Sequence, residues 1–252
     1  MKVIFSFDDG RADAINAAKI LTKYGLKGTF HITTGFIDKS FLTKDFGEDT
    51  KPLTKKDIEW ILDNGMEISS HGDKHIMSIE DFNCSFEKIC GYYSTKKKPN
   101  TIGFSVPNSK YTQKELDSFV EGTKHKLSYV RVGRSPRCYD FIGKIQYVLY
   151  SITHLQSFYN SFNKNNLLID INKNLLFSVV VKKNDRAKTI INFIKKYSNK
   201  NCVAIFMLHS VVETPRNVWE YSIHEFEQIA CYIKSENISC LTLEELSRTY
   251  EI

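Results

Sequence analysis

The chain has 252 residues, a hydrophobic fraction of 42%, a charged fraction of 25% and a formal net charge of +6. This composition is typical of a folded globular protein and excludes an intrinsically disordered chain. Lys and Arg are spread along the whole sequence, and it carries no zinc-finger or RNA-recognition signature. We therefore expect no nucleic-acid partner.

Cysteine usage and the first residues indicate a compartment. The six cysteines include no C-x-x-C pair, which favours reduced thiols, and the chain opens on the strand-like run KVIFSF. We therefore expect a cytoplasmic protein. Residues 141–160 are largely apolar but contain Lys144 and His154, so we expect a packed or interfacial helix there and no span. Any membrane contact would then be confined to the surface.

Runs rich in β-branched and aromatic residues alternate with amphipathic helical patterns along the chain. In chain order, the expected strands are 2–7, 27–33, 66–70, 101–106, 127–132, 175–181, 202–208 and 238–243. The clearest expected helices are 12–25, 54–65, 112–126, 187–198 and 222–237. Thr54 and Thr112 are expected N-caps, and Gly25 and Gly65 are expected helix ends.

Repeated strand–helix units predict the α/β class, with a parallel sheet covered by helices. Seven or eight such units in a chain of this length favour closure into a distorted (β/α)7-8 barrel. We expect a single domain over residues 1–252. Residues 136–175 interrupt the alternation, and we expect an inserted helix or excursion there.

Polar side chains follow the expected strands at the points where the strands end. In a parallel barrel these carboxyl ends form the active site. The residues concerned, in chain order, are Asp8 and Asp9, His71 and His75, Pro107 and Asn108, Arg131 and Arg134, and His209.

Asp8 and Asp9 are neighbours, and neighbours on a regular strand point to opposite faces. A turn at Gly10 would allow both carboxylates to reach the barrel rim, one for a metal and the other for a proton. An alternative is that Asp9 only caps a helix that starts near Arg11.

His71 and His75 are four residues apart, so a helical turn would place both imidazoles on one face. Two imidazoles and a carboxylate are a ligand set typical of catalytic zinc. The alternative is a pair of surface histidines. His209 ends a core strand and is expected at the rim, although a structural histidine is also compatible with that position. Packing and solvent suffice to explain the remaining histidines, His31, His125, His154 and His224.

Taken in order, these motifs resemble the polysaccharide deacetylase family, which is carbohydrate esterase family 4. FSFDDG resembles the family's T-F-D-D-G motif, SSHGDKH resembles H-[ST]-x-x-H, and FMLHS resembles its late Leu-His motif. The resemblance implies a distorted barrel that removes acetyl groups from N-acetylated sugars or polysaccharide precursors, such as those of the cell envelope.

The resemblance also assigns roles to residues. Asp9, His71 and His75 would bind a divalent metal, usually Zn²⁺, and metal-activated water would attack the acetyl group. Asp8 would act as the general base and His209 as the general acid. Pro107 and Asn108 would border the substrate, with a backbone N–H near Asn108 stabilising the oxyanion.

The sequence departs from the family pattern at three places. The third motif, R-x-P-[YF], reads Ser-Val-Pro-Asn over residues 105–108, so its base-orienting arginine is missing. Arg131 or Arg134 is the expected substitute. Gly72 replaces the usual Ser or Thr between the histidines, and the fourth motif, with Asp and Trp, is not recognisable.

Two other functions are compatible with these residues. One is a catalytically inert barrel that binds metal or glycan, since two motifs are degraded. The other is a glycosyltransferase whose carboxylate pair holds Mn²⁺ and a nucleotide sugar, although the ordered histidines would have no role in it.

Overall fold

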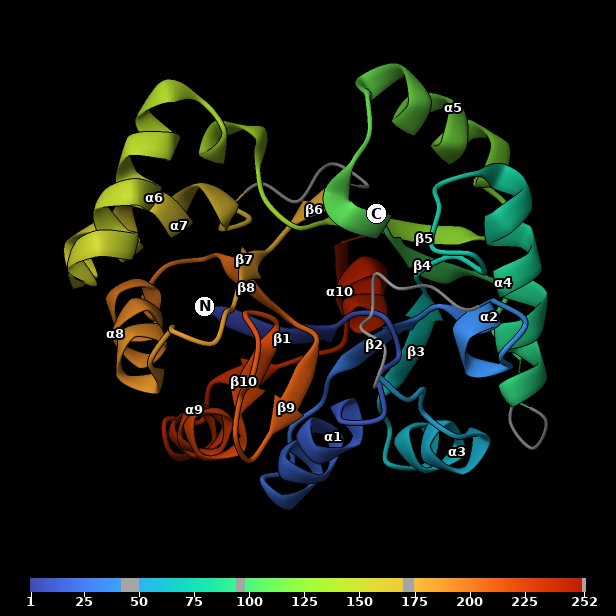
Figure 1. Ribbon diagram of the computed structural model, residues 1–252, viewed down its shortest axis with the longest axis horizontal. Helices are drawn as coiled ribbons and strands as arrows, with labels where there is room; N and C mark the ends of the chain where they lie inside the picture. The colour runs from blue at the N-terminus through green and yellow to red at the C-terminus, as the bar shows by residue number, and fades with distance from the viewer. Residues whose placement is uncertain (42–49, 94–97, 170–174, 251–252) are drawn as a thin grey trace.

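The computed structural model describes residues 1–41, 50–93, 98–169 and 175–250 (Figure 1). Its centre is a nearly closed barrel of eight parallel strands, which confirms the predicted α/β barrel and single domain. The strands run in the spatial order β6-β5-β4-β3-β2-β1-β8-β7. Their bounds are β1 Lys2–Phe7, β2 Thr29–Ile32, β3 Glu67–Ser70, β4 Ile102–Ser105, β5 Leu127–Val132, β6 Leu175–Phe177, β7 Val179–Val180 and β8 Val203–Leu208.

The two edges of the nearly closed barrel are joined by a break in one expected strand. Residues 175–181 were expected to form one strand, but they form β6, which pairs with β5, and β7, which pairs with β8. Ser178 lies between them, and its hydroxyl is 2.9 Å from the carbonyl oxygens of both Val132 and Gly133. The chain therefore steps from one edge of the sheet to the other at Ser178, which brings the two edges together.

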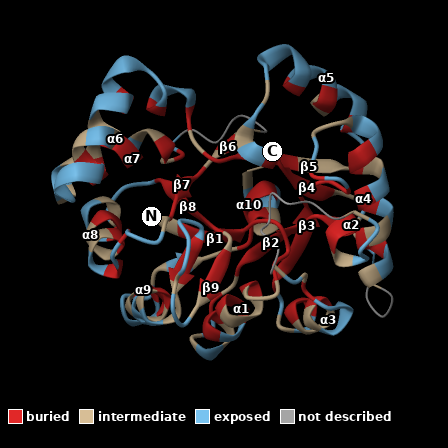
Figure 2. Ribbon diagram, viewed as in Figure 1, coloured by how far each residue is buried: buried red, intermediate tan, exposed pale blue. Residues whose placement is uncertain are grey.

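Amphipathic helices cover the outside of the barrel, where their apolar faces form the larger hydrophobic core (Figure 2). The expected caps are confirmed, because Thr54 and Thr112 both form capping boxes, and Gly25 and Gly65 both have positive φ. The sequence patterns missed α2, α4 and the last helix, which begins at Leu243 inside the strand expected over 238–243. The bounds are α1 Ala14–Lys23, α2 Thr34–Ile37, α3 Lys55–Asp63, α4 Ile79–Tyr92, α5 Gln113–Thr123, α8 Ala187–Tyr197 and α9 Ile223–Ser235.

The last helix closes the amino end of the barrel, where the strands begin. β11 (Ser239–Cys240) pairs with β1, and α10 (Leu243–Tyr250) follows it at the centre of the view in Figure 1. The backbone N–H of Glu244, at the start of α10, donates to the carboxylate of Glu67 at 2.8 Å. Leu243 and Leu246 pack inside the barrel in a second core cluster. The opposite end, where the strands finish, is left open, and the candidate functional site lies there.

One side of the barrel carries two further helices, α6 (Phe141–Thr153) and α7 (Gln156–Asn163). The predicted packed or interfacial helix over 141–160 is thus two helices, because His154 adopts a left-handed conformation between them. Tyr150 is buried on the inner face of α6, whereas Phe141 is 79% and Ile152 is 72% exposed. Across the described residues, we find no helix with the length and apolar character needed to cross a membrane. The predicted insertion extends into residues 170–174, which lie outside the described residues.

A short two-stranded sheet lies at the carboxyl end of the barrel strands. It pairs β9 (Ser210–Val212) with β10 (Glu220–Ser222), directly after β8, and neither strand was expected. The sheet carries His209 and Trp219 at its borders, so it shapes one wall of the site.

Candidate active site

The first strand ends in a turn that aims both aspartates at the barrel rim. Asp9 has φ +75° and Gly10 has φ +81°, so the left-handed turn begins one residue earlier than predicted. A side chain at Gly10 would press on Ile32 and Ile37, which explains the glycine. The alternative that Asp9 caps a helix is wrong, because α1 begins at Ala14.

A loop, and no helical turn, brings the two histidines together. The segment after β3 does not turn helically, because Gly72 has φ +83° and His75 has φ +57°. Both imidazoles are buried, which excludes a surface pair. The carboxylate of Asp81, from α4, holds the loop by accepting the backbone N–H groups of Asp73 at 2.7 Å and Lys74 at 2.9 Å. A Cβ at residue 72 would collide with that carboxylate, so Asp81 occupies the space of a side chain there.

Asp9, His71 and His75 form a compact group of metal-type ligands. One donor atom from each lies within 4.8 Å of the other two. The Nε2 atoms of His71 and His75 are 3.2 Å apart. The Nδ1 atom of His71 lies 2.9 Å from the carbonyl oxygen of Ser105, which fixes Nδ1 as the protonated nitrogen and leaves Nε2 as the ligand atom. These three residues come from the ends of β1 and β3.

Arg11 orients the carboxylate of Asp9. Its guanidinium lies 2.7 Å from Oδ2, while Oδ1 faces His71 at 3.4 Å and His75 at 3.7 Å. Burial alone would raise the pKa of Asp9, but the neighbouring imidazoles and Arg11 lower it overall. The carboxylate therefore stays ionised, with one oxygen free of Arg11. The sequence pattern missed Arg11, although it stands two residues after Asp9.

Asp8 is paired with Arg131, which reaches it from the end of β5. The guanidinium Nη2 of Arg131 contacts both Asp8 Oδ1 and the hydroxyl of Ser105. Both charged side chains are buried. Burial raises the pKa of Asp8, yet Arg131 and the nearby imidazoles outweigh it and lower the pKa to about 2. Arg131 thus reaches Asp8 from the strand end beside Ser105, the residue that stands at the arginine position of the third motif.

Arg134 lies apart from this pair. Its guanidinium carbon is 5.4 Å from the ring centroid of Tyr147 and 5.2 Å from that of Phe162, both on the α6–α7 side. Of the two arginines predicted as substitutes, Arg131 is the one that contacts Asp8 in the described residues.

A buried polar network lies beneath Asp8. His31 places Nδ1 3.7 Å from Asp8 Oδ1 and Nε2 3.1 Å from the hydroxyl of Tyr129. That hydroxyl donates to Glu67 at 2.6 Å. Burial and the charge of Arg131 lower the pKa of His31 well below 6.5, so its ring is neutral. The network links the floor of the site to the amino end of the barrel, and the strand pattern gave no sign of it.

His209 follows β8 and closes the site on the opposite flank. Its ring packs against Trp219, with centroids 4.7 Å apart. Its Nδ1 atom is buried and makes no hydrogen bond within the described parts of the chain. Burial lowers the pKa of His209, although Asp9 and Asp8 oppose that shift.

The predicted residues meet around one cavity of about 200 Å³ at the carboxyl ends of the strands. Asn108 has φ +54° and lines this cavity, whereas Pro107 is buried behind it. Sequence patterns did not identify Trp219 or Tyr139. The predicted residues that line the cavity are Asp8, Asp9, His71, His75, Asn108, Arg134 and His209.

The fold and this site define a class of protein: a parallel barrel with an Asp-His-His ligand group beside a buried Asp–Arg pair. A model of the polysaccharide deacetylase family matches residues 1–141, more than half of the 252-residue chain. The chain therefore belongs to the polysaccharide deacetylase family. Comparison with curated protein sequences gives no match.

Solved structures agree on the fold. A peptidoglycan N-acetylglucosamine deacetylase is 14% identical, with 97% of this chain and 86% of that one covered at a TM-score of 0.51. A family 4 carbohydrate esterase from Streptomyces lividans, solved with acetate, is 13% identical, with coverages of 95% and 91% and a TM-score of 0.52. A family 4 pseudoenzyme from Bacillus anthracis is 10% identical, with coverages of 98% and 65% and a TM-score of 0.53.

Proposed function

We propose that this protein is a metal-dependent hydrolase that removes an acetyl group from an N-acetylated sugar or polysaccharide precursor. The observation that carries the proposal is the single cavity lined by Asp9, His71 and His75 together with Asp8 and His209. Residues 1–252 act as one catalytic domain in this proposal, with residues 136–175 as an insertion beside it.

The donor set fits a divalent cation. The Nε2 atoms of the two imidazoles, 3.2 Å apart, and one carboxylate oxygen of Asp9 converge where a cation would satisfy all three lone pairs. Two nitrogen donors and one oxygen donor suit Zn²⁺. When bound by Asp9, His71 and His75, the cation would polarise the acetyl carbonyl and lower the pKa of water.

Asp8 and His209 carry the proton transfers. Asp8, which Arg131 keeps ionised, accepts a proton from the attacking water. His209 donates a proton to the departing nitrogen, because an amide anion is a poor leaving group. A backbone N–H beside Asn108 donates to the oxyanion. Arg131 positions Asp8 and does not contact the substrate.

Acetate release from N-acetylglucosamine oligosaccharides tests this assignment. Asp8→Asn should reduce kcat by about 10²- to 10⁴-fold with unchanged zinc content, because it removes the proton acceptor and keeps the three metal-type ligands. Since it also leaves Arg131 buried without its counterion, circular dichroism of the variant checks that the protein is folded. Asp13→Asn is the matched control, since Asp13 lies outside the cavity lining. Full activity in Asp8→Asn would contradict the mechanism.

The pH profile gives a second test. Since burial lowers the pKa of His209 below 6.5, its protonated form is lost as the pH rises through that lower value. We expect kcat to fall on this limb and the limb to disappear in His209→Gln. A rate that stays constant above this range would exclude His209 as the acid.

An inert barrel is the second candidate, favoured by the unpartnered Nδ1 of His209, which no carboxylate among the described residues orients. Glycan binding without acetate release over a broad substrate panel would support it. The predicted glycosyltransferase is tested by metal content, because imidazole ligands favour zinc over Mn²⁺.

Contact with a membrane surface would bring the protein to lipid-linked precursors of the cell envelope. The outer face of α6 exposes Phe141, Ile145, Val148 and Ile152, and residues 141–163 contain Lys144 but no Asp or Glu. Exposed apolar side chains on one helix face, in a segment without acidic residues, suit the interfacial region of a bilayer. Co-sedimentation with phosphatidylglycerol vesicles, lost in a Phe141→Ser/Ile152→Ser variant, would support the contact, and equal sedimentation of both proteins would refute it.

A further inference from the structure

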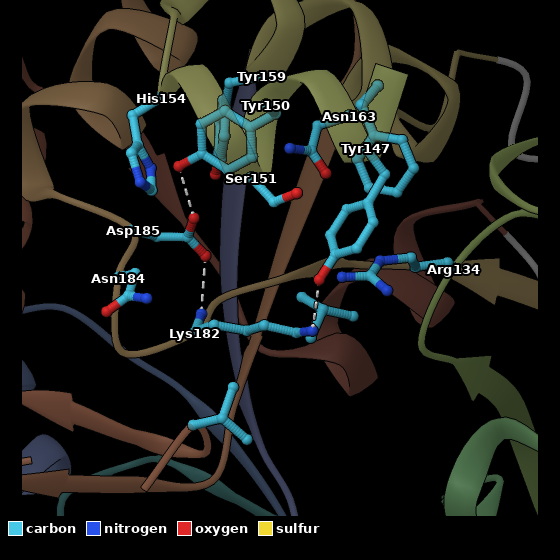
Figure 3. Close-up of a pocket in the computed structure, with 13 residues that line it drawn as sticks. Arg134, Tyr147, Tyr150, Ser151, His154, Tyr159, Asn163, Lys182, Asn184 and Asp185 are labelled. Atoms are coloured by element: carbon cyan, nitrogen blue, oxygen red, sulfur yellow. Dashed lines mark hydrogen bonds between the residues drawn. The ribbon is translucent and has the colours of Figure 1, made fainter. Parts of the chain in front are cut away.

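A second cavity lies between the barrel and the α6–α7 helices. It has a volume of about 140 Å³, and its walls come from α6, α7, the end of β7 and the segment that follows (Figure 3). A cavity of this size holds a group of roughly one ring. Aromatic side chains form much of its wall, among them Tyr147, Tyr150 and Tyr159.

Two cations share one side of this cavity. Arg134 and Lys182 lie 5.4 Å and 5.3 Å, respectively, from the ring centroid of Tyr147. Figure 3 shows both side chains turned toward the Tyr147 hydroxyl, which lies 3.0 Å from Lys182 Nζ. The Nε atom of Arg134 is buried without a hydrogen-bond partner. Neither cation forms an ion pair with any residue that the structure describes.

Asp185 is the one carboxylate among the described residues of this wall, and it lies outside ion-pair distance of both cations. Asp185 accepts the Tyr150 hydroxyl at 2.7 Å and the backbone N–H of Lys182 at 2.8 Å. Its side chain thereby fixes the backbone that presents the lysine. Burial raises the pKa of Asp185, whereas the hydrogen bond from Tyr150 and the charges of Arg134 and Lys182 oppose that shift. Since two cations and one carboxylate line the cavity among the described residues, its wall keeps an excess of positive charge.

The second cavity adjoins the metal-type site. Arg134 and Val180 line both cavities, and the neighbours Val218 and Trp219 line the second and the first. Lys182 also lies 5.6 Å from the ring centroid of Trp219, which packs on His209. A substrate whose acetyl group enters the first cavity would thus extend a neighbouring group into the second.

We propose that this second cavity is an anion subsite, and that the substrate carries a carboxylate or phosphate beside its acetylated sugar. Arg134 and Lys182 bind the oxyanion, and Tyr147 supports both cations with its ring. A guanidinium suits the paired oxygens of either anion. The inference rests on the proposed deacetylase function, because it names the substrate class of that site.

Three acetylated substrates test the subsite. They are the neutral N-acetylglucosamine disaccharide, a disaccharide of N-acetylglucosamine and glucuronic acid, and N-acetylglucosamine 1-phosphate. We expect kcat/KM to be at least about tenfold higher for one or both anionic substrates than for the neutral one. This factor corresponds to one additional hydrogen bond to a charged group. The preferred anionic substrate identifies carboxylate or phosphate as the source.

Lys182→Met is the main variant, because Lys182 lines the second cavity and not the first. It should raise KM for the preferred anionic substrate about tenfold, with kcat and the neutral substrate little changed. Lys182→Arg, which keeps the positive charge, should retain the preference for the anionic substrate. Lys183→Met is the control, since Lys183 lies one residue on, is exposed and contacts the Arg216 carbonyl at 3.4 Å.

Calorimetric binding of glucuronate and glucose 1-phosphate separates this proposal from the proposed function. Binding to the zinc-loaded protein that weakens at least tenfold in Lys182→Met supports the subsite even if no acetate is released. Equal binding by both proteins overturns it. An equal loss of kcat/KM for neutral and anionic substrates in Lys182→Met also overturns it, because that pattern indicates a structural role.

Discussion

Charge is arranged differently in the two cavities at the carboxyl ends of the strands. In the first, Asp8 contacts Arg131 and Asp9 contacts Arg11, all within the buried rim. In the second, Arg134 and Lys182 have no carboxylate within ion-pair distance among the described residues. Both cavities belong to one barrel and share Arg134 in their walls. The first arrangement fixes side-chain geometry, whereas the second leaves charge available to a ligand.

Burial explains the contrast. A buried charge is costly unless it is paired, so the side chains inside the rim come with partners. Arg134 and Lys182 are half-buried and retain access to water, so their charges remain tolerable without a counterion. This difference predicts unequal responses to substitution.

The largest effect is expected from breaking the buried pair. Arg131→Met should lower the free energy of unfolding by about 3–5 kcal/mol, because it leaves Asp8 buried and unpaired. Arg134→Met is the matched variant in the second cavity and should cost less than about 1 kcal/mol, as for a cation stacked on rings. Urea unfolding measures both. Equal losses of unfolding free energy in the two variants would contradict the difference between the cavities. The double variant Asp8→Asn/Arg131→Met should be more stable than Arg131→Met alone.

The loop over residues 71–75 should tolerate serine, a usual family residue at position 72, poorly. Gly72→Ser combines a left-handed backbone, worth about 1–2 kcal/mol, with a collision against Asp81, so we expect a loss of about 2–4 kcal/mol. Gly65→Ser isolates the backbone cost, because Gly65 has φ +72° and a Cβ there would have no atom within 4 Å. Zinc affinity should fall about 10- to 100-fold in Gly72→Ser alone. Similar behaviour of the two variants would show that Asp81 does not determine the loop.

Lowering the pH should reduce the free energy of unfolding, because Asp8 in the first cavity becomes protonated. Its folded pKa of about 2 lies below the ordinary value of 3.8, so its stabilising contribution is complete above pH 3.8 and is lost as the pH falls toward 2. In metal-free protein, the stability difference between wild type and Asp8→Asn should shrink by about 2 kcal/mol over that window. A difference independent of pH would show that Arg131 does not hold this carboxylate ionised.

The smallest effect is expected on the outer face of α6. Ile152 is 72% exposed, so Ile152→Ser should change the free energy of unfolding by no more than about 0.5 kcal/mol. Phe82→Ala, in the buried core, should cost about 3–5 kcal/mol by comparison. Thermal unfolding of both variants checks the difference, and a large loss in Ile152→Ser would mean that this face is covered in solution.

Local patterns in the sequence determined much of the barrel. Apolar strand runs, amphipathic periodicity and the caps at Thr54 and Thr112 are set by neighbours in the chain, so they were predictable. The polar residues at strand ends could also be named, because a parallel barrel collects its strand ends at one rim. That reasoning brought Asp8, Asp9, His71 and His209 to one cavity.

Tertiary structure alone decided which side chains meet. Asp8 and Arg131 are 123 residues apart, and only the neighbouring positions of strand ends in the barrel bring them into contact. Asp81 supports the loop of His71 and His75 from a helix that the periodicity missed. The strand expected over 175–181 is divided between the two edges of the sheet, one part pairing with β5 and the other with β8. The cations of the second cavity likewise converge from separate segments. Long-range pairing energies decide such features, and sequence neighbours carry no record of them.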